Sequence, residues 1–154
     1  MGGHYNYRLV NGESGDPAVY IQSKHSALRM LFDLGDISSL TVKDILKCNF
    51  AFVSHTHMDH FVGFVHWLRI HVPHFSKLHI AGPAGLAKNV QSALRSYTWN
   101  LVTPDQIDII VREVDAMGKI NSYQIRNTCQ FELETVPNPT IEIVFPHKLP
   151  LLLS

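Results

Sequence analysis

The fold and chemistry of this chain are decided by one stretch, Phe52-Val53-Ser54-His55-Thr56-His57-Met58-Asp59-His60-Phe61-Val62-Gly63. It begins in a short apolar run, residues 50–53, which is typical of a strand buried on both faces. It ends in residues 61–70, where apolar side chains recur at the spacing of a helix with a wide apolar face. The pattern His-x-His-x-Asp-His-x-x-Gly is therefore predicted to lie in a loop between a strand and a helix.

This loop concentrates side chains that bind metal ions. His55 and His57 are two positions apart, so both rings can turn to the same side and bind one cation. Asp59 and His60 are adjacent at a predicted helix N-terminus and can present an oxygen and a nitrogen to a second cation. Imidazole and carboxylate ligands suit Zn²⁺, and also Mn²⁺ or Fe²⁺. Two such ions a few ångströms apart can share a hydroxide and act on a phosphoryl or acyl group.

The remaining histidines and the two cysteines carry no comparable pattern. The chain has ten histidines, and histidine is the commonest metal ligand in proteins. Scattered histidines are nevertheless usually surface residues or core residues with satisfied hydrogen bonds. We interpret Cys48 and Cys129 as small hydrophobic residues, and Tyr97 and Trp99 as core or groove-wall residues. The histidines that we assign to the ordinary class are His4, His25, His66, His71, His74 and His79.

Composition excludes several classes of protein. The chain has 154 residues, of which 45% are hydrophobic and 17% charged, which argues against a disordered tail, a collagen-like repeat or a coiled coil. Thirteen basic and thirteen acidic residues give a formal charge of zero, so the overall charge predicts no strongly basic nucleic-acid clamp. No apolar run approaches the ~20 residues of a membrane span, and the N-terminus has no apolar signal-peptide core. With two cysteines and no disulfide framework, we expect a cytoplasmic protein without membrane association.

The order of predicted elements indicates a single α/β domain over residues 1–154, layered in the α+β manner. Strands and helices alternate in the first part of the chain, and strands then follow one another. This order favours helices packed on a mixed sheet. The expected strands are 7–10, 18–22, 28–34, 50–53, 77–80, 107–114, 120–125, 129–136 and 141–145, and the expected helices are 42–47, 61–70 and 84–97.

Two motifs of this chain resemble those of a known family. His55-x-His57-x-Asp59-His60 is similar to the signature of the metallo-β-lactamase superfamily. Leu31-Phe32-Asp33-Leu34-Gly35-Asp36 resembles the earlier motif of that superfamily, in which an aspartate at the end of a strand braces the metal loop without binding the metal. The resemblance implies an αββα sandwich and assigns the bracing position to Asp33. Such a carboxylate orients the ligand imidazoles and raises their basicity.

Further segments resemble one branch of the superfamily, the bacterial ribonuclease Z-like proteins, which are related to nucleases that process the 3′ end of tRNA. The resemblance implies attack of a metal-activated hydroxide on a phosphodiester, with RNA as a candidate substrate. It also places Asp59 where it can orient or deprotonate the attacking water. The segments are 8–12, 15–17, 52–63 and 96–102.

The same resemblance implies a third histidine ligand from a later part of the chain. Phe145-Pro146-His147-Lys148-Leu149-Pro150 stands at the corresponding place, so His147 would join His55 and His57 on one ion. Proline stands here where the family often has aspartate. The bridging aspartate and the last histidine of the family normally come from a second half of similar size, and no candidates for them remain in this chain.

Two readings of function therefore stay open. In the first, the protein is a metal-dependent phosphodiesterase with one or two zinc ions, and the chain forms the N-terminal portion of the fold or a shortened version of it. In the second, the chain binds metal or a partner without turnover. Within the enzymes, lactone, thioester or cyclic-nucleotide hydrolysis is an alternative, because one fold serves many substrates. An incomplete fold would leave apolar strand faces uncovered, which favours homodimerisation.

Overall fold

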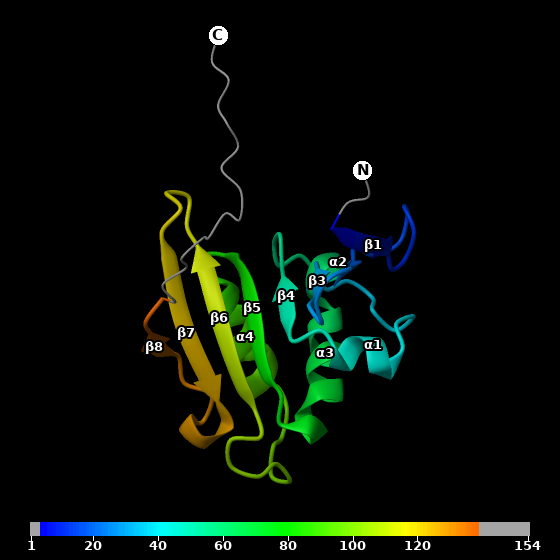
Figure 1. The fold of residues 1–154 in the computed structure, drawn as a ribbon. Coiled ribbons are helices and arrows are strands. Elements are labelled where there is room, and N and C mark those ends of the chain that lie inside the picture. The colour runs from blue at the N-terminus through cyan, green and yellow to red at the C-terminus, as the bar shows by residue number, and fades with distance from the viewer. Residues whose placement is uncertain (1–3, 139–154) are drawn as a thin grey trace.

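The computed structural model describes residues 4–138. Its strands form a single eight-stranded sheet in which each strand pairs with its neighbours in the sequence, in the order β1 to β8 (Figure 1). The mixed α/β sheet predicted from the order of the elements is confirmed. The predicted strand 141–145 and His147 lie outside the described residues.

The first three strands form an antiparallel meander. They are β1 (Tyr5–Leu9), β2 (Val19–Ser23) and β3 (Arg29–Phe32). β3 ends two residues earlier than the sequence predicts, because Asp33 takes a left-handed backbone conformation with φ 58°. A residue at positive φ cannot continue a strand, so the chain turns away from the sheet at the residue that the motif singles out.

Parallel strands connected by helices make up the middle of the sheet. After β3 come α1 (Val42–Leu46), β4 (Phe50–Phe52), α2 (Met58–Phe61), α3 (Gly63–His71), η1 (Val72–His74), β5 (Lys77–Pro83), α4 (Leu86–Arg95) and β6 (Asp108–Val114). β3, β4, β5 and β6 are parallel to one another. The helix predicted over 61–70 begins earlier, as α2, and Val62 keeps a right-handed helical backbone between α2 and α3.

The last part of the sheet is antiparallel again. β7 (Ile120–Arg126) pairs with β6, and β8 (Glu134–Val136) pairs with β7. The prediction of one strand over 129–136 is wrong in its first half. The short 3₁₀ turn η2 (Asn127–Cys129) comes first, and Gln130 and Phe131 then have positive φ of 54° and 60°, which is incompatible with a strand.

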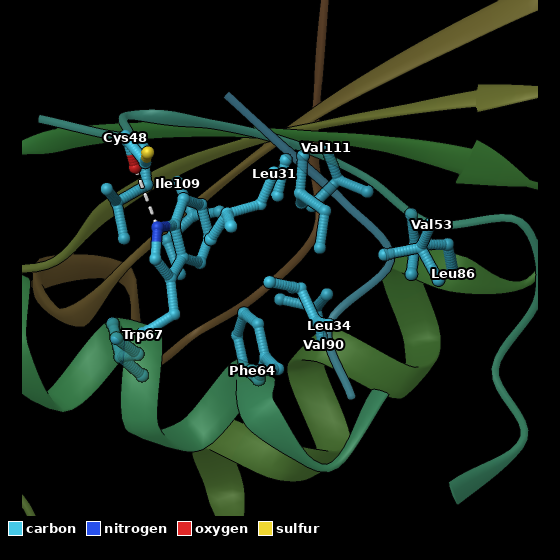
Figure 2. Close-up of a cluster of buried hydrophobic side chains, with 14 of the residues drawn as sticks. Leu31, Leu34, Cys48, Val53, Phe64, Trp67, Leu86, Val90, Ile109 and Val111 are labelled. Carbon is cyan, nitrogen blue, oxygen red and sulfur yellow. Dashed lines mark hydrogen bonds between the residues drawn. The ribbon is translucent and has the colours of Figure 1, made fainter. Parts of the chain in front are cut away.

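The hydrophobic core lies between the helices and one face of the sheet. Leu31, Ile109 and Val111 of the sheet pack against Phe64 and Trp67 of α3, and all five are fully buried (Figure 2). The indole nitrogen of Trp67 donates a hydrogen bond of 2.7 Å to the carbonyl of Cys48, so the one polar atom of this side chain is satisfied inside the core. Among residues 4–138, no helix is both long and apolar enough to cross a membrane.

Candidate metal centre

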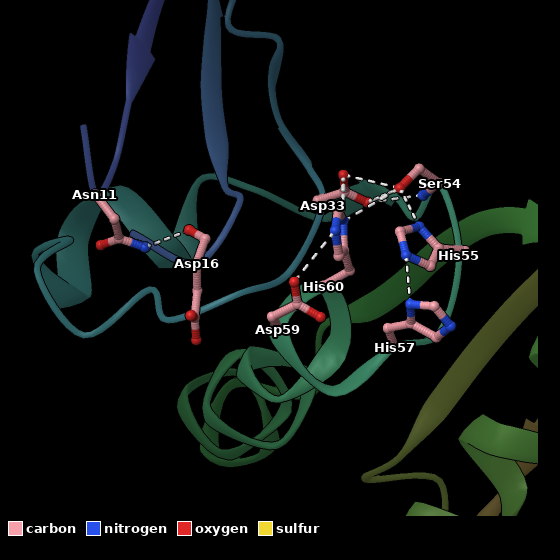
Figure 3. Close-up of polar contacts among 8 residues, drawn as sticks. All are labelled: Asn11, Asp16, Asp33, Ser54, His55, His57, Asp59 and His60. Atoms are coloured by element: carbon pink, nitrogen blue, oxygen red, sulfur yellow. Dashed lines mark hydrogen bonds and ion pairs between the residues drawn. The ribbon is translucent and has the colours of Figure 1, made fainter. Parts of the chain in front are cut away.

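The predicted site residues meet at one edge of the sheet. Asp33 follows β3, and the loop that carries His55 to His60 follows β4. Because β3 and β4 are parallel neighbours, their carboxyl ends lie at the same edge. The structure therefore brings Asp33 and the loop together, as Figure 3 shows.

Direct backbone contact fixes the start of α2 and α3 against the turn after β3. The amide of Leu34 donates to the carbonyl of His60 at 2.9 Å, and the amide of Gly63 donates to the carbonyl of Leu34 at 2.8 Å. A Cβ atom on Gly63 would overlap the carbonyl oxygen of Gly35, and one on Gly35 would lie 2.5 Å from the carbonyl oxygen of Asp59. Only glycine allows this close approach. The approach fixes the position of His60 relative to Asp33.

The carboxylate of Asp33 is hydrogen-bonded to both Ser54 and His60 of the loop. It is 6% exposed, although a carboxylate is rarely buried unless it is paired. The amide of Ser54 donates to Oδ1 at 2.7 Å, and the hydroxyl of Ser54 lies 2.9 Å from both carboxylate oxygens. Nδ1 of His60 lies 3.0 Å from Oδ2. Asp33 thus holds one ring of the loop directly and contacts a serine that reaches another.

These contacts assign the tautomers of two histidine rings. A carboxylate can only accept, so Nδ1 of His60 carries the proton that is donated to Asp33, and Nε2 is left with a free lone pair. The hydroxyl of Ser54 donates its one proton to Asp33 and therefore accepts from Nδ1 of His55, which lies 3.0 Å away. Nε2 of His55 is therefore unprotonated as well, and its lone pair faces Nδ1 of His57 at 3.0 Å. A bare ring nitrogen is the form of histidine that binds a metal.

The loop donors face one another in two pairs. Nε2 of His55 lies 3.0 Å from Nδ1 of His57. Two nitrogens on one tetrahedral zinc ion are separated by about 3.3 Å, given Zn–N bonds of about 2.0 Å, so this pair is close to the spacing that zinc requires. Nε2 of His60 lies 3.5 Å from Oδ2 of Asp59. The rings of His55 and His60 are in contact, with centroids 3.9 Å apart, so the two pairs are neighbours.

Neither pair completes a metal site within the described residues. Over residues 4–138 no three histidine, cysteine, aspartate or glutamate side chains are arranged to hold a metal ion. The reason is that each pair offers two donors, whereas a structural zinc ion takes four and a catalytic one takes three plus water. His147, predicted as the third ligand of His55 and His57, lies outside the described residues. The donor types fit zinc, and the number of described donors does not close its coordination.

An asparagine outside the predicted set holds a neighbouring loop in place. The side-chain amide of Asn11 donates one hydrogen bond to the carbonyl of Asp16 at 2.7 Å and one to the carbonyl of Asp36 at 2.6 Å. Both donors of the amide are therefore used (the bond to Asp16 is drawn in Figure 3). The prediction from sequence also missed Ser54, for which the only signal is a hydroxyl residue directly before His55.

Two of the other histidines, the buried His71 and the half-buried His79, have structural partners. Nε2 of His71 lies 3.0 Å from the carbonyl of Ile45, and burial lowers the pKa of this ring. His79 stacks on Phe50, with centroids 4.8 Å apart, and burial followed by the charge of Arg112 lowers its pKa. Cys48 is fully buried, and burial raises the pKa of its thiol to about 12. Cys129 is half-buried, and both cysteines are free thiols.

Comparison with known proteins agrees with the resemblance read from the motifs. Ribonuclease Z of Deinococcus radiodurans is 30% identical to this chain over 105 residues, which are 65% of this chain and 32% of the relative. The chain is related to ribonuclease Z. It spans about a third of the length of that relative, and no protein family model matches it.

Two solved structures are similar to this chain. The short form of human tRNase Z matches with a TM-score of 0.50 and 23% identity, over 72% of this chain and 44% of the human chain. The metallo-β-lactamase fold protein YhfI of Bacillus subtilis matches with a TM-score of 0.47 and 15% identity, over 78% of this chain and 57% of that chain. The predicted α/β class and metallo-β-lactamase-like fold are confirmed for this part of the architecture.

Proposed function

We propose that this chain carries metal-binding residues of a metal-dependent phosphodiesterase of the ribonuclease Z type. One observation carries the proposal. Four metal-binding side chains of one loop, His55, His57, Asp59 and His60, face one another in two adjacent pairs above the buried carboxylate of Asp33. The sequence similarity to a ribonuclease Z supports the chemistry.

Each pair would begin one metal site. His55 and His57, joined by His147, would hold the first ion, and Asp59 and His60 would begin the second. Zinc suits this mixture of nitrogen and oxygen donors, with Mn²⁺ and Fe²⁺ as alternatives. A bound divalent ion lowers the pKa of a water ligand towards neutrality and screens charge on phosphate oxygens.

Proton transfer and the orientation of the histidine rings would fall to further side chains of the site. Asp59 is 54% exposed, so its carboxylate can accept a hydrogen bond from an attacking water or take up its proton. Asp33 keeps the ring of His60 in one tautomer and fixes His55 through Ser54. The leaving group would receive its proton from a residue outside this set, because no described side chain of the cluster is placed to donate one.

The proposed substrate is an RNA phosphodiester, since two of the three similar proteins are a ribonuclease Z and a tRNase Z. We also propose the cytoplasm as the compartment, because free thiols at Cys48 and Cys129 agree with a reducing environment. Residues 1–154 would act as a single domain, consistent with the single sheet and single core of the described part.

A second function is favoured by the incomplete donor set. With two pairs of donors and no third ligand among residues 4–138, the chain can bind one metal ion without assembling a working pair. It would then be a metal-binding module without turnover. A reacting group misplaced by about 1 Å can lose ~10²-fold in rate, so we expect the 154-residue chain to hydrolyse phosphodiesters slowly or not at all.

The experiment is an assay with two substrates. Hydrolysis of bis(p-nitrophenyl) phosphate and of a 3′-extended tRNA is measured with added Zn²⁺ or Mn²⁺, for the wild type, the variant His55→Ala/His57→Ala and the control His74→Ala. Metal-dependent hydrolysis that the double variant loses and the control keeps supports the enzyme. Metal uptake without hydrolysis supports the binding module. Turnover of a lactone or β-lactam without phosphodiesterase activity contradicts the nuclease assignment.

A further inference from the structure

The loop with the histidines has a second contact with the fold besides Asp33, and this contact comes from α4. The side-chain amide of Asn89 donates a hydrogen bond of 2.8 Å to the hydroxyl of Thr56. Thr56 stands between His55 and His57 in the sequence. Asp33 follows β3 and α4 follows β5, and these two strands flank β4, which leads into the loop. The loop is therefore contacted from the sides of both neighbouring strands.

The hydrogen bonds of Asp33 do not extend to the whole loop. They reach Ser54 and His60, and the hydroxyl of Ser54 in turn accepts from the ring of His55. Among residues 4–138, the ring of His57 has a single hydrogen-bonding contact, to Nε2 of His55, and it does not cap α2. Within this range, one member of the first donor pair thus has no direct partner outside the loop.

The hydrogen bond from Asn89 connects this part of the loop to the fold. Over the part of the chain that the structure describes, it is the only hydrogen bond that joins residues 56–58 to the fold outside residues 54–62. Thr56 directly precedes His57, so an anchored Thr56 restrains the backbone from which the ring of His57 projects. The contact therefore limits the positions that this ring can take before any metal ion binds.

Packing in the core holds the helix that carries Asn89. Leu86, Val90 and Leu94 recur at every fourth position of α4, and all three are buried. Figure 2 shows the first two among the core side chains. An apolar stripe of this kind fixes the rotation of a helix against its sheet. Asn89 is exposed and adjacent to Val90, so it lies at the border of the stripe, where its amide can leave the helix towards the loop.

Polar contacts fix the start of the same helix. Glu113 of β6 is 8% exposed, and its Oε1 accepts from the amides of Gly85 at 3.1 Å and Ala87 at 2.7 Å. A carboxylate is favourable at a helix N-terminus, where backbone amides lack partners within the helix. A Cβ atom on Gly82 would lie 2.7 Å from the carbonyl oxygen of Val53, so the end of β5 lies directly against the end of β4. The start of α4 is thereby fixed beside the strand that leads into the loop.

We propose that Asn89 is a positioning residue of the loop, which acts through Thr56 on the ring of His57. The inference rests on the proposed function, in which His57 is a metal ligand. The amide of Asn89 is uncharged, and it donates to the hydroxyl of Thr56 and leaves the histidine nitrogens free for a metal ion. A ligand that is already ordered loses less conformational freedom on binding. Asn89 therefore raises metal affinity without touching the metal ion.

The first test is calorimetric titration of the chelator-treated 154-residue chain with Zn²⁺. Asn89→Ala should weaken zinc binding about two- to tenfold, which is the contribution of one neutral hydrogen bond. Thr56→Val should weaken it equally, and the double variant no further, because both changes remove the same contact. Thr56→Ser keeps the hydroxyl and should keep the affinity. The control Gln91→Ala removes another 2.8 Å hydrogen bond of α4, to the carbonyl of Phe131, and should leave the affinity unchanged.

The second test uses the metal-free chain, so it decides the inference independently of zinc binding. The NMR order parameter of the Thr56 methyl group and the ring ¹⁵N signals of His57 are compared in the wild type, Asn89→Ala and Gln91→Ala, with urea denaturation as a check of folding. Both side chains should become more mobile in Asn89→Ala alone. Equal order in Asn89→Ala and the wild type, or additive losses of zinc affinity in the double variant, would overturn the proposal. A wild type that binds no zinc, with order lost in Asn89→Ala, would contradict the proposed function and support the contact.

Discussion

The histidines of this chain occupy two kinds of surroundings. In the loop after β4, Nε2 of His55 faces Nδ1 of His57 at 3.0 Å, and Nε2 of His60 faces Oδ2 of Asp59 at 3.5 Å. In the body of the protein, His71 bonds to the carbonyl of Ile45 and His79 stacks on Phe50. The first group is assembled around a buried carboxylate, whereas the second contacts a backbone carbonyl, an aromatic ring and the guanidinium of Arg112.

These surroundings explain which histidines are candidate metal ligands. Burial favours the neutral ring, and it is the largest cause of the lowered pKa values of His71 and His79. Asp33 adds what burial lacks, because it accepts from one ring nitrogen and so directs the lone pair of the other nitrogen outward.

The largest effect is expected from the carboxylate that distinguishes the two groups. Asp33→Ala should lower zinc affinity by about 10- to 100-fold, because loss of such a carboxylate frees the ring of His60 and the hydroxyl of Ser54. Calorimetric titration of the metal-free protein measures it. Asp33→Asn is the matched variant, since asparagine tolerates the left-handed backbone at φ 58°. If Asp33→Asn binds zinc as the wild type does, the carboxylate has no such role.

The loop histidines also depend on a glycine contact that the buried histidines do not share. Gly63→Ala should lower the free energy of unfolding by about 1–3 kcal/mol, because the added Cβ meets the carbonyl of Gly35 and the backbone must move. Urea denaturation measures the change. Val62→Ala is the control, because Val62 is 50% exposed and adjacent. Equal stability of the glycine variant and the wild type would show that the contact is looser than described.

A smaller effect is expected from the serine that connects Asp33 to His55. Ser54→Ala removes a hydroxyl that lies 2.9 Å from Asp33 and 3.0 Å from His55, and one such hydrogen bond contributes about 1 kcal/mol. Zinc affinity should therefore fall several-fold, and less than in Asp33→Ala. Ser38→Ala, outside the cluster, should leave the affinity unchanged. A Ser54→Ala affinity below that of Asp33→Ala would reverse the order of importance that the geometry implies.

The smallest expected effect is a pH dependence of the stability that comes from the buried His71. The folded-state pKa of His71 lies below its unfolded value of about 6.5, so below pH 6.5 the unfolded state binds more protons. Stability should fall as the pH drops below 6.5, with a slope of at most about 1.4 kcal/mol per pH unit for one proton. His71→Gln should flatten the slope, whereas the variant His25→Ala, at an exposed site, should not. The same slope in His71→Gln as in the wild type would contradict the buried, neutral assignment.

The sequence predicts the part of the fold and site that depends on local pattern. Helical spacing after the His–Asp cluster and the apolar run 50–53 locate the loop, and the resemblance to a known motif singles out Asp33. The sequence does not reveal Ser54 or Asn11, because their roles depend on carbonyls and carboxylates 5 to 25 positions away. It also misjudges residues 129–136, where the positive φ of Gln130 and Phe131 has no local sequence signal such as glycine.

The central claim is that the loop from His55 to His60 binds a divalent metal ion. Its most direct test is calorimetric titration of the chelator-treated 154-residue chain with Zn²⁺, followed by elemental analysis, for the wild type, His55→Ala/His57→Ala and the control His74→Ala. We expect one tightly bound ion per chain in the wild type and the control, and none in the double variant. Equal zinc content in the wild type and the double variant would contradict the claim.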